Sequence, residues 1–116
     1  FLDSVIDGGL GFDTLEVTGF GALDLKTNTS LSGVERIDLD NGFNNSVLLD
    51  VSDVLKVSGG DTLYFDGSAG DSVLSGGAFS TTGGTSVVAG VTYDMYSDLT
   101  NSVFLGIEQG TGVVVA

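Results

Sequence analysis

Apolar and polar residues alternate in several short runs along the first two thirds of the chain, and glycine or Asp/Asn turns separate these runs. The candidate strands are residues 14–17, 22–25, 34–39, 47–51, 63–65 and 72–74. Alternation with a period of two buries one face of a strand and leaves the other in water. The pattern, with few helix formers and many Val and Thr residues, predicts an all-β fold.

The pattern changes after a run of small residues at 76–84, which we interpret as an internal loop. Beyond it, Ala89-Gly90 predicts a two-residue hairpin turn between strands at 85–88 and 91–96. Glu108 to Thr111 predicts a second hairpin between strands at 102–107 and 112–115. We expect this last third, 85–116, to be an antiparallel meander.

These elements predict one all-β domain over residues 1–116. Residues 1–75 are expected to form short stacked strands, as in a β-solenoid or β-roll, and an antiparallel β-sandwich is the alternative. The only helix predicted is a single turn over residues 50–56, with Ser52 as its cap.

A short core of Asp or Asn, then Ser or Thr, then Val or Leu recurs along the chain. It begins at Asp3, Asp13, Asn45, Asp61, Asp71 and Asn101. Two pairs of these cores enclose an Asp-Gly step, in DSVIDGGLGFDTL and in DTLYFDGSAGDSV. The simplest explanation is a set of β-turns, for which Asp, Ser and Gly are suited. Their number favours a repeated structural unit.

One stretch, GGLGFDTLE from Gly8 to Glu16, fits the nonapeptide G-G-x-G-x-D-x-U-x at every specified position. Here the chain resembles the RTX (repeats-in-toxin) calcium-binding family of secreted bacterial proteins. Residues 34–47 resemble the segment that flanks such repeats in large type I-secreted bacterial adhesins. The resemblance implies glycine-rich turns whose carbonyls and aspartates bind Ca²⁺, and a chain that folds outside the cell.

Two loops are therefore candidate calcium sites. In the first, Asp7 and Asp13 can supply carboxylates, and the resemblance adds Gly9 and Gly11 as turn residues around the ion. In the second, Asp66 and Asp71 bracket a loop of small residues, so that both carboxylates could meet on one ion. The alternative for each loop is a turn in which the aspartate accepts hydrogen bonds from its own backbone, without a metal.

Charge and composition exclude several classes of partner and of catalytic site. Sixteen acids and three bases give a net charge of −13, which argues against binding to nucleic acid or to an anionic membrane and suits divalent cations. Because Cys and His are absent, disulfides and Cys–His or Ser–His nucleophilic sites are excluded. No apolar run is long enough for a membrane-spanning helix.

We interpret the chain as a non-catalytic, calcium-binding structural or extender module of a secreted bacterial adhesin. We expect it to be secreted or on the bacterial cell surface, and its partners to be neighbouring domains of the same long chain, with a surface glycan as a possible ligand. One alternative is a lectin-like module that binds carbohydrate or peptide, with Tyr64, Tyr93 and Tyr96 pointing outward by alternation. Another is an accessory repeat module of a polysaccharide-modifying enzyme.

Overall fold

A computed structural model describes residues 6–7, 11–17, 21–26, 31–100 and 102–116, without the side chains of Ile6 and Asp7. The strands are β1 (Ile6–Asp7), β2 (Thr14–Glu16), β3 (Gly21–Asp24), β4 (Leu31–Ser32), β5 (Arg36–Asp38), β6 (Asn45–Leu48), β7 (Thr62–Asp66), β8 (Ser72–Leu74), β9 (Ser80–Val88), β10 (Val91–Ser97), β11 (Phe104–Glu108) and β12 (Val114–Val115). One helix, α1 (Val51–Ser58), lies between β6 and β7.

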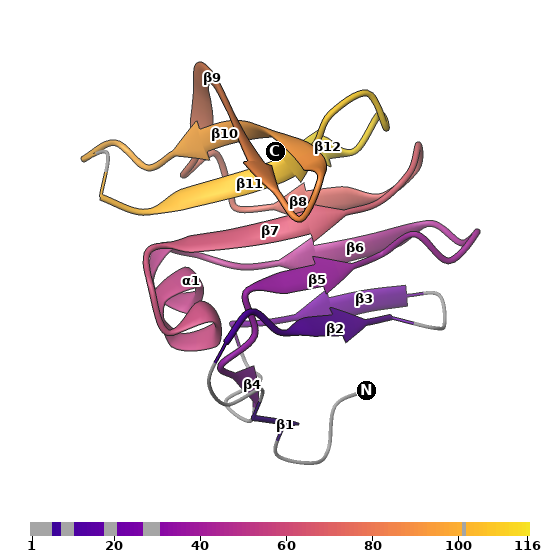
Figure 1. The fold of residues 1–116 in the computed structure, drawn as a ribbon, viewed down its shortest axis with the longest axis horizontal. Coiled ribbons are helices and arrows are strands. Elements are labelled where there is room, and N and C mark those ends of the chain that lie inside the picture. Colours follow the sequence, from indigo (N-terminus) through magenta and orange to yellow (C-terminus); the bar gives the residue numbers. More distant parts are fainter. Residues whose placement is uncertain (1–5, 8–10, 18–20, 27–30, 101) are drawn as a thin grey trace.

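Two large sheets make up most of the fold (Figure 1). The first has six strands in the order β2-β5-β7-β11-β10-β9, and the second has four in the order β12-β8-β6-β3. The four-stranded sheet is parallel throughout. The six-stranded sheet is mixed, because β2, β5, β7 and β11 are parallel whereas β10 is antiparallel to both β11 and β9. The chain passes from a strand of the first sheet to one of the second four times: β2 to β3, β5 to β6, β7 to β8 and β11 to β12.

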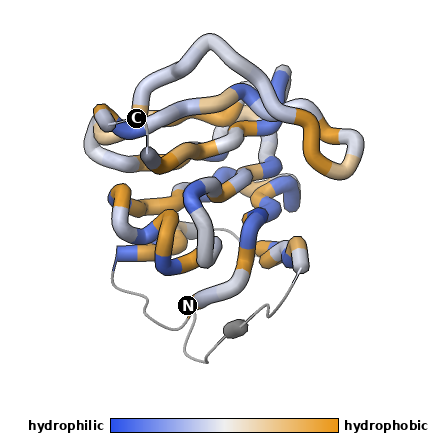
Figure 2. The backbone as a smooth tube through the Cα atoms, turned by 60° about the vertical axis from the view of Figure 1, so that its left-hand side comes forward, coloured by the Kyte–Doolittle hydropathy of each residue, from blue (hydrophilic) through white to orange (hydrophobic). Residues whose placement is uncertain are grey.

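The core is built from apolar residues that pair with one another across neighbouring parallel strands. In the six-stranded sheet the paired residues are Leu15, Ile37, Phe65 and Ile107. In the four-stranded sheet they are Leu23, Val47, Val73 and Val115. All eight belong to one apolar cluster or pack against it. The residues between them point to the opposite faces of the sheets. In Figure 2, hydrophobic and hydrophilic residues follow one another along the backbone.

The predicted helical turn is confirmed, and it extends to Ser58. The cap is Asp50 and not Ser52: the Asp50 side chain accepts from Asp53 N, and Asp53 Oδ2 accepts from Asp50 N at 2.8 Å. This reciprocal arrangement is a capping box made from two aspartates. At the other end Gly59, with φ of 69°, closes the helix through its N–H to Leu55 O. The buried face carries Val54 and Val57.

The expectation of an all-β fold is wrong, both as a stacked-strand β-solenoid and as an antiparallel sandwich. The structure is mixed α/β, with one short helix, one mixed sheet of six strands and two parallel sheets, of four strands and of two (β1 and β4). The error has a physical cause. An amphipathic strand has the same period of two whether its neighbours are parallel or antiparallel, so the sequence pattern does not distinguish the two.

The antiparallel meander expected for residues 85–116 is only partly correct. The first hairpin is confirmed, since β9 and β10 are antiparallel around Ala89-Gly90, whose φ angles of 52° and 82° suit a tight hairpin turn. The second hairpin is wrong, because β12 pairs in parallel with β8 and not with β11. The strand β9 begins at Ser80, inside the segment interpreted as a small-residue loop.

None of the helices in the described part of the chain is both long enough and apolar enough to cross a membrane.

Gly106 occupies a crowded position on the outer face of the six-stranded sheet. A Cβ there would overlap the Tyr64 ring, at 2.7 Å from Cε1, and would lie 3.3 Å from Tyr93 Cβ. We expect Gly106→Ala to lower the free energy of unfolding by about 1–3 kcal/mol, because the packed Tyr64 ring must shift. Chemical denaturation measures the change. Gly60→Ala is the matched control, since a Cβ at Gly60 meets nothing within 4 Å, and equal losses in both variants would contradict the packing argument.

Candidate functional site

Asp13, the aspartate of the complete nonapeptide, lies in the turn that leads into β2. Its backbone N donates to Glu35 Oε1 at 2.8 Å, and its carbonyl accepts from the backbone N–H groups of Glu35 and Arg36 at 3.1 Å each. Its Oδ2 atom is buried and receives no hydrogen bond from the residues that the structure describes. A buried carboxylate oxygen without a donor costs free energy unless a cation or water satisfies it. Asp13 therefore retains one buried ligand atom that its described neighbours do not satisfy.

The remaining residues of this loop are placed only in part. Gly11 lies in the same turn with φ of 92°, a conformation that favours glycine. Asp7 lies in β1, and its side chain, like the whole of Gly9, is outside the described residues. The structure thus places the turn and the Asp13 carboxylate, and the other predicted ligands of the first loop stay predictions.

In the second predicted loop, Asp71 has a structural role. Its side chain is buried, Oδ1 accepts from Asn45 N at 2.8 Å, and Oδ2 accepts from Ser68 N at 2.8 Å and from Ser68 Oγ at 3.3 Å. It closes its own turn and ties that turn to the start of β6. This is the metal-free arrangement considered as the alternative for the loop. The described hydrogen bonds of Asp66 and Asp71 lead to different partners. A calcium site shared by the two aspartates stays a prediction.

Two copies of the recurring Asx-Ser/Thr-apolar core lie side by side on β6 and β8. Ser46 pairs with Ser72 and Val47 with Val73, while the two serine Oγ atoms are 3.1 Å apart. The Asp71 carboxylate binds the Asn45 N–H one residue earlier. At these two positions the recurring motif serves to hold neighbouring parallel strands in register.

A polar cluster that the sequence did not predict lies on the outer face of the six-stranded sheet. The Tyr93 hydroxyl donates to Asp66 Oδ1 at 2.5 Å, and Arg36 Nη1 is 3.7 Å from Asp66 Oδ2. Arg36 is held by a bond from Nε to Thr14 Oγ1 at 3.0 Å, and its guanidinium carbon lies 5.6 Å from the centre of the Phe12 ring. The sequence did contain a signal for this cluster. Arg36 is the single arginine in a chain with sixteen acids, so an ion pair with one of them was to be expected.

The aromatic residues beside this cluster correct the expected orientation of the tyrosines. Tyr93 is fully buried, with its ring centroid 4.8 Å from that of Tyr64, and Tyr96 packs against the core. Tyr64 is half-buried and also contacts Phe12, at 6.0 Å between ring centroids. Of the three tyrosines expected to point outward, Tyr93 is therefore buried, and Tyr64 and Tyr96 are half-buried. The antiparallel pairing of β10, which places Tyr93 beside Tyr64, is the cause.

The electrostatics of the cluster keep Tyr93 protonated. Burial, and then the hydrogen bond to Asp66, raise the pKa of Tyr93 to about 12, against the opposing effect of Arg36. At neutral pH the phenol is a hydrogen-bond donor to Asp66 and is not available as a base.

Carboxylates also form a row across the parallel strands of this face. Glu16, Asp38 and Asp66 are in register on β2, β5 and β7, and Glu108 accepts from Gly67 N at 3.2 Å. Burial raises the pKa of Glu108, and the nearby charges of Asp66, Asp40 and Asp38 add to this effect, whereas the Gly67 hydrogen bond opposes it. The row is a source of repulsion, since like charges on adjacent strands are unfavourable. Among the residues with described positions, no three acids are grouped so that they could hold a metal ion.

Comparison of the chain with protein-family models, with curated proteins and with solved structures finds no match.

Asp71→Ala should lower the free energy of unfolding by about 2–4 kcal/mol, because it leaves the Asn45 and Ser68 N–H groups without their charged acceptor. Urea denaturation measures the loss. Asp40→Ala is the matched control, since Asp40 is exposed and its removal relieves repulsion on Glu108. A change of less than about 0.5 kcal/mol for Asp71→Ala, the size usual for a surface substitution, would contradict the role assigned to this carboxylate.

The raised pKa of Tyr93 predicts a loss of stability in strong alkali. An unfolded tyrosine titrates at about 10, whereas Tyr93 in the folded protein titrates at about 12. Its contribution to stability is therefore complete below pH 10 and is lost as the pH rises towards 12. Tyrosinate absorbance at alkaline pH should show one late-titrating tyrosine, which disappears in Tyr93→Phe and remains in Tyr96→Phe. Identical titrations for the two variants would contradict the assignment.

Proposed function

We propose that the chain is a non-catalytic structural module of a secreted bacterial adhesin, and that Ca²⁺ bound at the loop ending in Asp13 stabilises its folded state. The observation that carries the proposal is the buried Asp13 Oδ2, which no described residue satisfies. It occurs at the aspartate of the one complete G-G-x-G-x-D match, where the resemblance to the RTX family implies a ligand. The sequence motif and the unsatisfied oxygen thus both point to Asp13.

The charge of the molecule supports the same proposal. The chain carries a net charge of −13, and the acidic row on β2, β5 and β7 adds local repulsion within the folded state. A divalent cation that binds only the folded state would offset this repulsion and stabilise the fold by mass action. The resemblance implies the Asp13 carboxylate and the Gly11 carbonyl as ligands, with Asp7 and Gly9 as the expected partners.

The wider biological role follows from the family resemblance and is proposed on that basis. The module would act as an extender or spacer, with neighbouring domains of the same long chain as its partners, outside the cell or at the bacterial surface. Calcium outside the cell would then favour the folded state of the module. Neither nucleic acid nor a membrane is a proposed partner, because the surface is strongly acidic.

Thermal unfolding in millimolar calcium, in EGTA and in magnesium tests the proposal. Calcium at a hundred times its Kd should stabilise the protein by about 2.7 kcal/mol relative to EGTA. Asp13→Asn should remove most of this gain. In EGTA the same substitution should not destabilise the protein, because it replaces a buried carboxylate that lacks a donor.

Asp94→Asn is the matched control, since Asp94 lies on β10 and its Oδ1 accepts from Gln109 Nε2 at 3.1 Å, outside the loop. It removes the same charge but should leave the calcium effect intact. Equal unfolding temperatures in calcium and EGTA would refute calcium stabilisation. Equal effects of the two substitutions would show that net charge, and not a site at Asp13, is responsible.

A further inference from the structure

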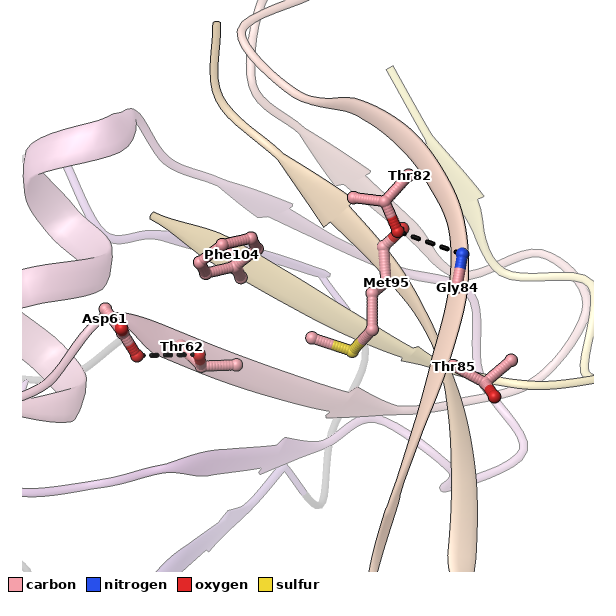
Figure 3. A pocket seen from close by; sticks show the side chains of 7 residues that line it. All are labelled: Asp61, Thr62, Thr82, Gly84, Thr85, Met95 and Phe104. Atoms are coloured by element: carbon pink, nitrogen blue, oxygen red, sulfur yellow. Dashed lines mark hydrogen bonds between the residues drawn. The ribbon is translucent and has the colours of Figure 1, made fainter. Parts of the chain in front are cut away.

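A groove lies on the outer face of the six-stranded sheet, between β9 and the strands β7 and β11 (Figure 3). Its volume is about 420 Å³. Phe104 and Met95 form its apolar part, with Asp61 and Thr62 on one side and Thr82 on the other, while the Thr85 side chain points away from Phe104. None of these residues belongs to the loop proposed to bind calcium or to the Tyr93–Asp66–Arg36 cluster.

The groove exists because β9 departs from regular pairing with β10. Thr85 pairs with Asp94 and Thr81 with Tyr96, so three residues of β9 lie opposite Met95 alone. The extra residues form a bulge that contains Gly83, with φ of 78°. The bulge is held by hydrogen bonds from Thr82 Oγ1 to Met95 O at 3.1 Å and from Gly84 N to Thr82 Oγ1 at 3.0 Å. The wall of the groove is therefore fixed by hydrogen bonds within the strand pair.

The opposite side of the groove is fixed as well. The backbone N–H of Phe104 donates to Asp61 O at 2.7 Å, which ties the start of β11 to the start of β7. The Thr62 hydroxyl donates to Asp61 Oδ1 at 2.9 Å. Asp61 is exposed, and this is its one described side-chain hydrogen bond. Its second oxygen can accept from a ligand.

The chemistry of this groove suits a sugar ring. A pyranose has an apolar C–H face, which packs on an aromatic ring, and a rim of hydroxyls, which pair with hydroxyl and carboxylate side chains. Phe104 and Met95 supply the first kind of contact, and Thr62 and Asp61 supply the second. The groove volume lies at the lower end of the range of about 300–1,000 Å³ for small-molecule sites, which suits one or two sugar units.

Charge decides which sugars fit. Asp61 lies in the groove and the whole chain carries a net charge of −13, so an anionic sugar is repelled. We propose that the groove between β9 and β7/β11 binds one or two neutral sugar units of a glycan. This binding function goes beyond the structural role proposed above and uses different residues.

NMR titration of the isotopically labelled protein with cellobiose, lactose and maltose tests the proposal, in a calcium-containing buffer. At least one of these disaccharides should bind with a Kd on the order of 1 mM and shift the amide signals of Thr62, Gly84, Met95 and Phe104. Phe104→Ala should weaken binding about tenfold, because it removes the stacking surface. Phe43→Ala is the matched control, since Phe43 is an exposed phenylalanine that does not line the groove.

A second variant tests the proposal independently, in case Phe104→Ala does not fold. Asp61→Asn keeps an oxygen that can accept from Thr62 but removes the charge, and it should weaken the binding of neutral disaccharides while leaving the fold intact. Digalacturonate is the anionic probe and should not bind the original protein. The proposal is overturned if no neutral disaccharide shifts the groove signals, if the shifts map outside the groove, or if digalacturonate binds equally well.

Discussion

Burial of one apolar ladder from each large sheet is the constraint on which the remaining structure depends. Leu15, Ile37, Phe65 and Ile107 contribute from the first sheet, and their counterparts from the second sheet belong to or pack against the same cluster. In a β-strand a shift of register by one residue moves every apolar side chain to the wrong face. The two ladders therefore fix the register of the parallel strands in both large sheets, and the positions of the polar residues on these strands follow from it.

The same register determines where the acidic residues lie on the outer face of the six-stranded sheet, and it causes repulsion between them. It brings Glu16, Asp38 and Asp66 into one row, where like charges repel. Tyr93 and Arg36 stabilise the negative charge of Asp66. Two backbone N–H groups stabilise that of Asp71. Asp13 is different, because one of its buried oxygens has no described donor. This contrast is the reason for proposing a cation at Asp13 and a turn-forming role for Asp71.

The β9–β10 hairpin forms one side of the groove on the outer face of the six-stranded sheet. Between β8 and β11 the chain adds β9 and β10 to the edge of the six-stranded sheet and then returns to pair in parallel with β7. The bulge opposite Met95 interrupts the regular pairing of β9 with β10 on the side where Phe104 and Met95 line the groove. The groove thus results from an irregularity at a sheet edge, where bulges are common and often re-aim side chains.

The sequence by itself determined the local features of this protein. Alternation predicted most strands, Ala89-Gly90 predicted the β9–β10 hairpin, and apolar spacing predicted the helical turn, because these signals depend on residues close together in the chain. Only the tertiary structure decided strand order and direction, the pairing of β12 with β8, and the burial of Tyr93. It also decided which aspartates have hydrogen-bond donors: Asp66 finds its partner on β10 and Asp71 on β6, whereas both share the same local Asp-Gly-rich loop. A local pattern specifies which face of an element is buried, but which distant element covers that face depends on packing between segments that sequence spacing does not encode.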